Sequence, residues 1–342
     1  MAGAFPEIGF AVAFAGALAV TFALTPLARG VAVATGTYDH PVGYKQHARP
    51  TPYFGGIAVM GGFLVGVVAP GEELAHLWPL LIAAVGLFAI GTLDDRRGLP
   101  VSVRVVGEVA AAVLLWETGW GWGVFSDATN LVLTVLTVVG LVNAFNLMDN
   151  IDGSTAAVAS VSAAGAGMLA LIHNETGGAL VGFAVAGACA GFLPYNLARP
   201  SRIFLGDGGS MPVGLLIAAT IMAIPNGAPG WGWPIELAPL AGLVILDTSL
   251  VVISRMRRGV PVHMGARDHL THRLLARLGS ARRVALCLAA AQAALCLFVI
   301  ALDQLSRVQS VRGALLCAVL GIAVIAVLEG PRWVPASSRR SA

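Results

Sequence analysis

The sequence predicts an all-α, polytopic integral membrane protein, and two observations lead to this fold class. Hydrophobic residues make up 57% of the 342 residues, whereas charged residues make up only 11%. Apolar stretches of about 17 to 25 residues recur along the whole chain, and each is long enough to cross the hydrocarbon layer as a helix. No stretch between them could hold a separate soluble domain. The chain is therefore expected to form one membrane domain, residues 1–342.

The hydropathy pattern predicts eleven membrane spans along the chain. They lie near residues 5–28, 54–70, 77–93, 104–118, 128–147, 155–173, 178–195, 211–225, 235–254, 283–303 and 309–328. The first span has no basic segment before it and no convincing cleavage site after it. It is therefore expected to be a retained helix rather than a removed signal peptide.

The distribution of Lys and Arg predicts the orientation of these spans in the membrane. Nearly all of them follow odd-numbered spans, whereas the opposite side keeps Arg307 and Arg312. The positive-inside rule then puts the N-terminus outside and the C-terminus in the cytoplasm. The formal charge of +3 is accordingly a signal of sidedness, and no nucleic-acid partner is expected.

The polar clusters fall in five loops, all on the predicted cytoplasmic side. These loops are residues 38–56, 93–104, 143–154, 202–210 and 263–274. The predicted outer loops are short and consist of Gly, Trp, Pro and scattered acids, and His173 in one of them is expected to be merely solvated. This asymmetry predicts one composite site at the inner membrane face.

The third span ends in two adjacent carboxylates, Asp94 and Asp95. Two ionised carboxylates at a membrane boundary repel each other unless a cation or a shared proton relieves them. Arg96 and Arg97 could be that partner in a purely structural arrangement, and a metal ion is the alternative. A further acid, Asp247 in the ninth span, is expected to have a buried structural partner.

The stretch "NAFNLMDNIDGS" places Asn143, Asn146, Asp149 and Asp152 three residues apart at the end of the fifth span. A continuous helix would spread these side chains over opposite faces, so the helix is expected to break near Asp149 and Asp152. Converging amide and carboxylate oxygens suit a hard cation such as Mg²⁺. The stretch therefore predicts a cation site in an unwound turn.

The stretch "FLGDGGS" combines Asp207 with three glycines that allow close approach of the backbone. Ser210 is expected to cap a helix that starts at Met211. A helix N-terminus beside glycines attracts phosphate, although a plain Gly-rich turn between two helices explains the pattern as well. The chain has no GxSxG nucleophile motif and no Walker motif, so neither a covalent intermediate nor ATP is indicated.

The five stretches together resemble those of the polyprenyl-phosphate N-acetylhexosamine-1-phosphate transferases, a membrane family of the glycosyltransferase 4 type. Residues 39–56, "DHPVGYKQHARPTPYFGG", resemble the family's DxPxxRKxHxxPxPxxGG. The other four are similar to DDxxxLxxxxK/R, NxxNxxDGxDG, FxGDxGS and the HxHH loop. The likeness covers residues 39–274 and departs from the pattern at Tyr44, Asn150 and Thr271. The PIHHHFE-like stretch of the muramoyl-pentapeptide branch is absent, which favours the N-acetylglucosamine branch.

The resemblance implies the transfer of N-acetylglucosamine 1-phosphate from UDP-N-acetylglucosamine to undecaprenyl phosphate, with release of UMP. It implies Mg²⁺, or Mn²⁺ in its place, held by Asn146 and Asp207. It further implies a catalytic group of Asp94, Asp95 and Asp149. Substrate contacts would come from Lys45, Arg104, Asp152, Phe204, Arg267, His269 and His272.

Some alternatives stay open at this point. The same reaction could use another UDP-N-acetylhexosamine, such as UDP-N-acetylmuramoyl-pentapeptide, because one or two hydrogen bonds can decide such a choice. A polytopic transporter would also place acids and glycines in a membrane, but it should show repeat symmetry and polar groups near the midplane. The expected partners are a UDP-sugar, undecaprenyl phosphate and the lipid bilayer, with room for a homodimer.

Overall fold

The structure is a computed structural model that describes residues 5–39, 50–71, 74–225, 230–261, 267–330 and 333. Eight of the described helices are long and apolar enough to cross a membrane, which confirms the all-α membrane fold. The predicted number of eleven spans is not confirmed. The other three predicted spans coincide with the shorter helices α2, α4 and α8.

The helices of the first half are α1 (Phe5–Ala34), α2 (Gly55–Val68), α3 (Trp78–Arg97), α4 (Val101–Glu117), α5 (Asp127–Met148) and α6 (Ser154–Ile172). Those of the second half are α7 (Thr176–Asn196), α8 (Asp207–Ala223), α9 (Gly232–Leu237), α10 (Gly242–Arg258), α11 (Leu270–Leu278), α12 (Ala281–Asp303) and α13 (Arg307–Leu328). Two short strands, β1 (Tyr38–Asp39) and β2 (Thr51–Pro52), pair antiparallel, with Tyr38 opposite Pro52. Two 3₁₀ turns complete the described elements, η1 (Leu74–His76) and η2 (Ala238–Ala241).

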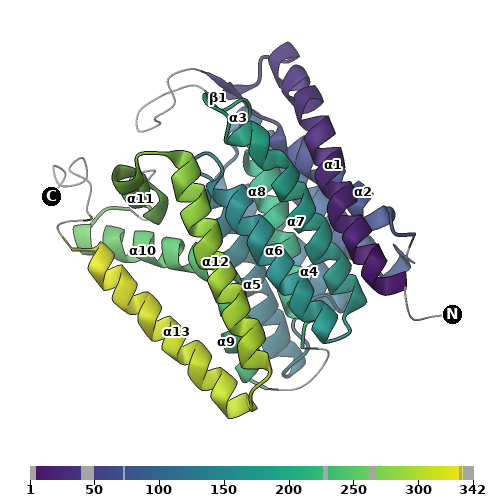
Figure 1. The fold of residues 1–342 in the computed structure, drawn as a ribbon, viewed down its shortest axis with the longest axis vertical. Coiled ribbons are helices and arrows are strands. Elements are labelled where there is room, and N and C mark those ends of the chain that lie inside the picture. Colours follow the sequence, from purple (N-terminus) through teal and green to yellow (C-terminus); the bar gives the residue numbers. More distant parts are fainter. Residues whose placement is uncertain are drawn as a thin grey trace.

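Helix α8 lies at the centre of the bundle, surrounded by α2, α3, α5, α6 and α7 (Figure 1). Its residues from Gly208 to Met222 are all buried, as expected for a helix that is apolar on every side. Its first residue, Asp207, has a partly exposed side chain, as does its last residue, Ala223, at the opposite end. The central helix thus brings its polar N-terminus to one end of the bundle. We call this the polar end, where α3 and α5 finish and α8 begins.

The predicted break between the fifth and sixth spans is confirmed. Helix α5 ends at Met148, and α6 begins at Ser154 after a turn in which Gly153 has φ = 77°. The predicted start of the eighth span is wrong, however. Helix α8 begins at Asp207, and Ser210 lies within its first turn rather than at its cap. The cause is a carboxylate from α3 that binds the first two backbone N–H groups, described below.

The ninth predicted span is interrupted rather than continuous. Residues 232–258 form α9, the 3₁₀ turn η2 and then α10, with Pro239 at the start of the 3₁₀ turn. Figure 1 shows α10 lying crosswise to α12, with α13 leaning away from the rest of the bundle. Helix α10 therefore carries its basic C-terminal turn sideways, next to α11.

Candidate functional site

The N-terminus of α8 is held by two carboxylates from other segments. Asp95 of α3 accepts hydrogen bonds from the N–H groups of Asp207 (2.9 Å) and Gly208 (3.1 Å). Asp149 accepts one from the N–H of Gly206. Carboxylates suit this place because the first N–H groups of a helix lack partners within the helix and carry partial positive charge. The phosphate site suggested by the "GDGGS" pattern is therefore filled by the protein's own carboxylates at these three N–H groups.

Close approach of the backbones explains two glycines of this region. Gly91 lies on α3 where a Cβ atom would stand 2.4 Å from the carbonyl oxygen of Asp207. Gly206 has φ = 74°, and a Cβ there would meet the Asp95 carboxylate at 2.5 Å. Side chains at either position would push α3 and α8 apart. The glycines thus permit the contact between Asp95 and the start of α8.

Arg104 of α4 joins two of the acids. Its Nη1 donates to Asp94 (2.8 Å) and to Asp207 (3.1 Å). Asp94 also accepts a hydrogen bond from the N–H of Leu99, which fixes the carboxylate at the end of α3. The side chain of Asp207 is 28% exposed and that of Asp94 only 9%, so Asp207 is the more accessible of the two.

The two predicted metal ligands, Asn146 and Asp207, are brought together by the fold. The amide of Asn146 donates to the Asp207 carboxylate and to Ser210 Oγ (3.1 Å). In the described part of the chain, no three His, Cys, Asp or Glu side chains form a group that could hold a metal by themselves. Mg²⁺ needs only one or two carboxylates when phosphate and water supply the rest, so the partly exposed Asp207 beside an amide fits that ion.

The third acid of the predicted catalytic group, Asp149, lies in the turn between α5 and α6. Burial, followed by the negative charges of Asp95 and Asp152, raises the pKa of Asp149 to about 7. Hydrogen bonds from Gly206 and Thr155 act in the opposite direction. Carboxylates this close together repel each other when ionised, and a positive charge nearby would stabilise their ionised form.

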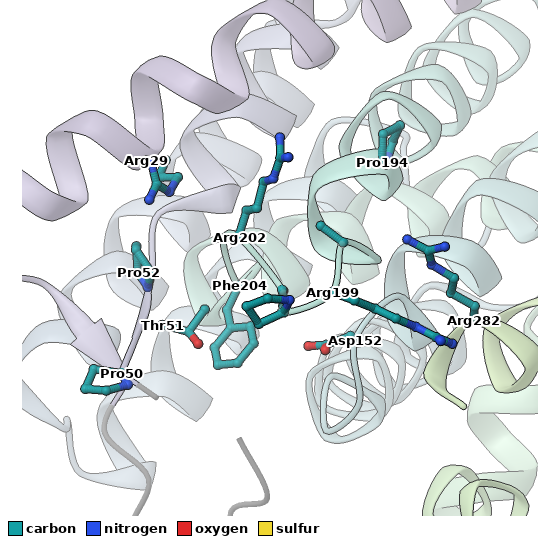
Figure 2. Close-up of a pocket in the computed structure, with 13 residues that line it drawn as sticks. Arg29, Pro50, Thr51, Pro52, Asp152, Pro194, Arg199, Arg202, Phe204 and Arg282 are labelled. Atoms are coloured by element: carbon teal, nitrogen blue, oxygen red, sulfur yellow. The ribbon is translucent and has the colours of Figure 1, made fainter. Parts of the chain in front are cut away.

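Phe204 and Asp152 line a cavity of about 1120 Å³ beside this cluster, with Thr51 and Pro52 of β2 (Figure 2). Two backbone hydrogen bonds fix Phe204, since its N–H donates to Pro52 and its carbonyl accepts from Gly55, each at 2.9 Å. The volume is slightly above the range that ligand pockets of proteins usually show, about 300 to 1,000 Å³. An aromatic side chain in such a pocket can stack on a nucleobase.

Four arginines of the same cavity were missed by the sequence reasoning: Arg29, Arg199, Arg202 and Arg282. In the view of Figure 2, Arg29 and Arg202 lie above Phe204, and Arg199 and Arg282 lie to its right. From sequence they read as ordinary positive-inside residues, because they follow three different spans. Their convergence makes the cavity attractive to an anionic ligand.

Another residue without a sequence signal is Asn196, at the end of α7. Its Oδ1 accepts from the N–H of Gly153 (2.6 Å), and its Nδ2 donates to the carbonyl of Ile203 (3.0 Å). The side chain is buried and joins the turn after α5 to the segment that carries Phe204. Asn196 therefore fixes the position of the turn between α5 and α6, which carries Asp149 and Asp152, relative to the cavity of Phe204.

The predicted histidines lie at the start of α11. His269 Nδ1 is 2.8 Å from Asp247 Oδ2, which confirms the expected buried partner of Asp247. The ring of His272 lies 5.9 Å from that of His269. Burial, together with the positive charge of His269, lowers the pKa of His272 to about 4, so this side chain is neutral near pH 7.

Of the two remaining predicted substrate contacts, Arg267 and Lys45, the structure describes only Arg267. Arg267 lies just before His269 in the chain, and its charge acts on His272. Lys45 lies outside the described residues. The predicted roles of all these residues in catalysis and binding stay predictions.

The fold and the site define a class: a polytopic membrane protein with an acidic cluster beside a basic, aromatic-lined cavity at one end of a helix bundle. A family model for glycosyl transferase family 4 matches residues 77–224. The chain is 31% identical over 308 residues to a decaprenyl-phosphate N-acetylglucosaminephosphotransferase of Mycobacterium tuberculosis, covering 78% of this chain and 76% of the relative. It is 29% identical over 283 residues to an undecaprenyl-phosphate alpha-N-acetylglucosaminyl 1-phosphate transferase of Salmonella typhi, covering 79% and 77%. The chain belongs to glycosyl transferase family 4, which confirms the resemblance.

Proposed function

We propose that this protein transfers N-acetylglucosamine 1-phosphate from UDP-N-acetylglucosamine to undecaprenyl phosphate and releases UMP. The observation that carries the proposal is that a basic cavity lined by an aromatic side chain, Phe204, lies only three residues along the chain from Asp207 of the acidic cluster. Similar chains from Mycobacterium tuberculosis and Salmonella typhi bear names for this kind of transfer, with decaprenyl and undecaprenyl phosphate as acceptors. UDP-N-acetylmuramoyl-pentapeptide is the second candidate for the donor, and decaprenyl phosphate is the alternative acceptor.

The nucleotide of the donor fits the cavity of Phe204. Its uracil would stack on the Phe204 ring, Asp152 would accept hydrogen bonds from the nucleoside, and the arginines would offset the charge of the diphosphate. The diphosphate would then extend toward Arg104 and Asp207. This placement puts the reacting phosphorus next to the acidic cluster.

The lipid acceptor fits a largely apolar groove of about 300 Å³ between α5, α8 and the α9–α10 segment. The groove is lined by Gly140, Leu141 and Ala144 of α5, and Ala144 lies only two residues before Asn146. An isoprenoid chain in this groove would enter from the lipid and end near the site. A membrane-embedded enzyme is needed because one substrate is a lipid.

In the reaction, an oxygen of undecaprenyl phosphate attacks the β-phosphorus of the UDP-sugar. The bond from that phosphorus to the bridging oxygen breaks, and UMP leaves with the electron pair. A phosphate monoester with a second pKa of about 6 is already largely ionised near pH 7, so the attack needs no strong base. Asp94 and Asp95 are therefore assigned to orienting Arg104 and the start of α8, and Arg104 to binding a phosphate oxygen.

Asp207 and Asn146 would hold Mg²⁺ against the diphosphate. The ion would supply charge neutralisation during phosphoryl transfer. The acids support this assignment, because Asp94 and Asp207 share one guanidinium, that of Arg104, whereas Asp95 and Asp149 accept hydrogen bonds from backbone N–H groups.

The test uses purified protein in detergent with undecaprenyl or decaprenyl phosphate, Mg²⁺ and a panel of UDP-sugars. We expect UMP release with UDP-N-acetylglucosamine, loss of release with a chelator, and recovery with Mg²⁺ or Mn²⁺. Release with only the muramoyl-pentapeptide donor would shift the assignment to the second candidate. Undiminished release after complete chelation would remove the metal from the proposal.

The proposed orientation puts the polar end in the cytoplasm, where UDP-sugars are made. A cysteine in place of Glu175, at the opposite end of the bundle, should react with an impermeant thiol reagent added to intact cells. A cysteine in place of Arg97, which is exposed at the polar end, should react only after the cells are opened. The reverse labelling pattern would contradict the orientation.

A further inference from the structure

A hydrogen bond between two polar side chains, Thr271 and Asn150, joins helix α11 to the turn between α5 and α6, which we call the acidic turn. The Thr271 hydroxyl is fully buried and hydrogen-bonds the side-chain oxygen of Asn150. These two residues are 121 positions apart in sequence and come from α11 and from the turn between α5 and α6. The contact therefore connects two of the five polar stretches.

The direction of this hydrogen bond follows from the other contact of Asn150. Its side-chain nitrogen donates to the carbonyl of Leu147 at 2.6 Å, in the last turn of α5. Because a carbonyl can only accept, the NH₂ group must face Leu147, and the amide oxygen must face Thr271. The Thr271 hydroxyl is thus the donor, and Asn150 is held at both ends.

Thr271 lies between the two histidines of α11, and a second partner fixes the same turn. Asp247 of α10 accepts from the N–H of Leu270 at 2.6 Å and pairs with His269 Nδ1. The first turn of α11 is thus attached to a membrane helix on one side and to the acidic turn on the other. The Asp247 contacts fix the turn to α10, and the Asn150 contact fixes it relative to Asp149 and Asp152.

The rest of α11 has its own anchors, which do not involve the acidic turn. Arg273 is buried and donates to the carbonyl of Asp268 (3.1 Å) and to Glu329 Oε1 (2.7 Å). Arg255 of α10 binds Asp268 through two hydrogen bonds of 3.0 and 2.9 Å. Loss of the Asn150 contact should therefore leave α11 folded against α10 and change only its placement over the site.

We propose that the hydrogen bond between Thr271 and Asn150 aligns the histidines of α11 with the transfer site, and that both are positioning residues that act as a pair. The inference rests on the proposed function and takes from the family resemblance that His269 and His272 contact the substrate. Both positions also depart from the patterns that the chain resembles, which have Gly at 150 and His at 271. A Gly at position 150 would have no side-chain acceptor, so the hydrogen bond needs the residues that this chain has at both positions.

The first test compares Thr271→Val with Thr271→Ser and with a matched control, Thr220→Val. Thr220 is also fully buried and donates to Leu216 (2.8 Å), but it lies 13 residues into α8, away from the site. Because small misplacements weaken transition-state contacts, Thr271→Val should lower kcat about tenfold with little change in the KM for UDP-N-acetylglucosamine. Thr271→Ser should keep most of the wild-type kcat, and melting temperatures should be alike for both valine variants. Equal kcat for both valine variants would show that the Thr271 hydroxyl is merely hydrogen-bonded in the core and does not position the histidines.

The second test asks whether the two residues act together. Asn150→Ala should lower kcat to a similar extent, and the double variant should be no slower than either single variant. Losses that multiply in the double variant would overturn the pairing.

A crosslink tests the contact without any donor. Asn150→Cys with Thr271→Cys should be joined by a short bis-methanethiosulfonate reagent, detected by peptide mapping. Asn150→Cys with Leu278→Cys, about 10 Å further along α11, should not be joined. Failure of the first crosslink overturns the contact. If the wild-type protein releases no UMP with any donor, both the proposed function and the positioning role are wrong. If the wild-type protein is active and Thr271→Val has the same kcat, only the positioning role of the pair is wrong.

Discussion

Two clusters of charged side chains lie at opposite ends of α6, and they are built differently. At the end away from the site, charges pair one to one. His173 Nε2 is 2.8 Å from Asp303 Oδ1, and Arg307 Nε is 3.3 Å from Glu236 Oε1. Arg307 also lies 4.1 Å over the ring of Trp233. The expectation that His173 is merely solvated is therefore wrong.

At the polar end, the charged side chains that the structure describes around the start of α8 are not paired one to one. Asp95 and Asp149 bind backbone N–H groups, and the single guanidinium of Arg104 is shared between Asp94 and Asp207. Both clusters contain acids, a base and an aromatic neighbour, so residue types alone do not separate them. The comparison teaches that paired charges fasten helices, whereas an excess of carboxylates held by the backbone is suited to binding a cation and a phosphorylated substrate.

The largest difference between the clusters should appear when one acid in each is neutralised. Asp207→Asn keeps the volume of the side chain but removes the carboxylate that we propose binds Mg²⁺, and it should lower UMP release by about 100-fold or more. Asp303→Asn should leave the rate within about twofold, because an ion pair of this kind contributes mainly a little stability. Near-normal turnover of Asp207→Asn at saturating substrates would contradict the assignment of the site.

Removing the base of each cluster should give the next largest contrast. Arg104→Gln leaves Asp94 and Asp207 close together without their shared guanidinium, and kcat/KM should fall by about tenfold or more. Arg307→Gln should lower only the melting temperature. Steady-state kinetics and thermal unfolding of both variants would check this, and equal kinetic losses would remove the distinction between the two ends.

A smaller effect is expected from the aromatic residues. Phe204→Leu should raise the KM for the UDP-sugar about tenfold at nearly unchanged kcat, because base stacking contributes on the order of 1 to 3 kcal/mol. Phe125→Leu is the matched control, since Phe125 packs on Trp231 with ring centroids 4.2 Å apart, outside the cavity of Phe204. A similar KM for both variants would argue against uracil stacking on Phe204.

The smallest effect concerns pH and stability at the polar end. The pKa of His272 is lowered from 6.5 to about 4, so the unfolded chain binds a proton between these values that the folded protein does not. Stability should therefore fall as the pH drops from about 6.5 to about 4. His272→Gln should flatten this part of the profile in a thermal unfolding series, and an unchanged slope would show that other groups cause it.

The sequence by itself determined the class of fold and singled out the acids and amides that meet near the start of α8. Hydropathy is a local property of the chain, so it predicted the helices of the bundle and the break after Met148. The same analysis placed the polar stretches at one end, and Asn146 and Asp207 do meet there. The order of the motifs along the chain also predicted the family, because that order is a property of the sequence and does not depend on tertiary structure.

Only the tertiary structure decided how these residues are used. Asp95 binds the N–H of Asp207 across 112 positions, and Thr271 binds Asn150 across 121. Such contacts depend on how closely helices approach, as at Gly91, and neither hydropathy nor spacing encodes that distance. The start of α8 at Asp207 and the convergence of the cavity's four arginines were missed for this reason. Hydrogen bonding and charge pairing between segments are properties of the packed bundle, so they become visible only once the helices are placed in space.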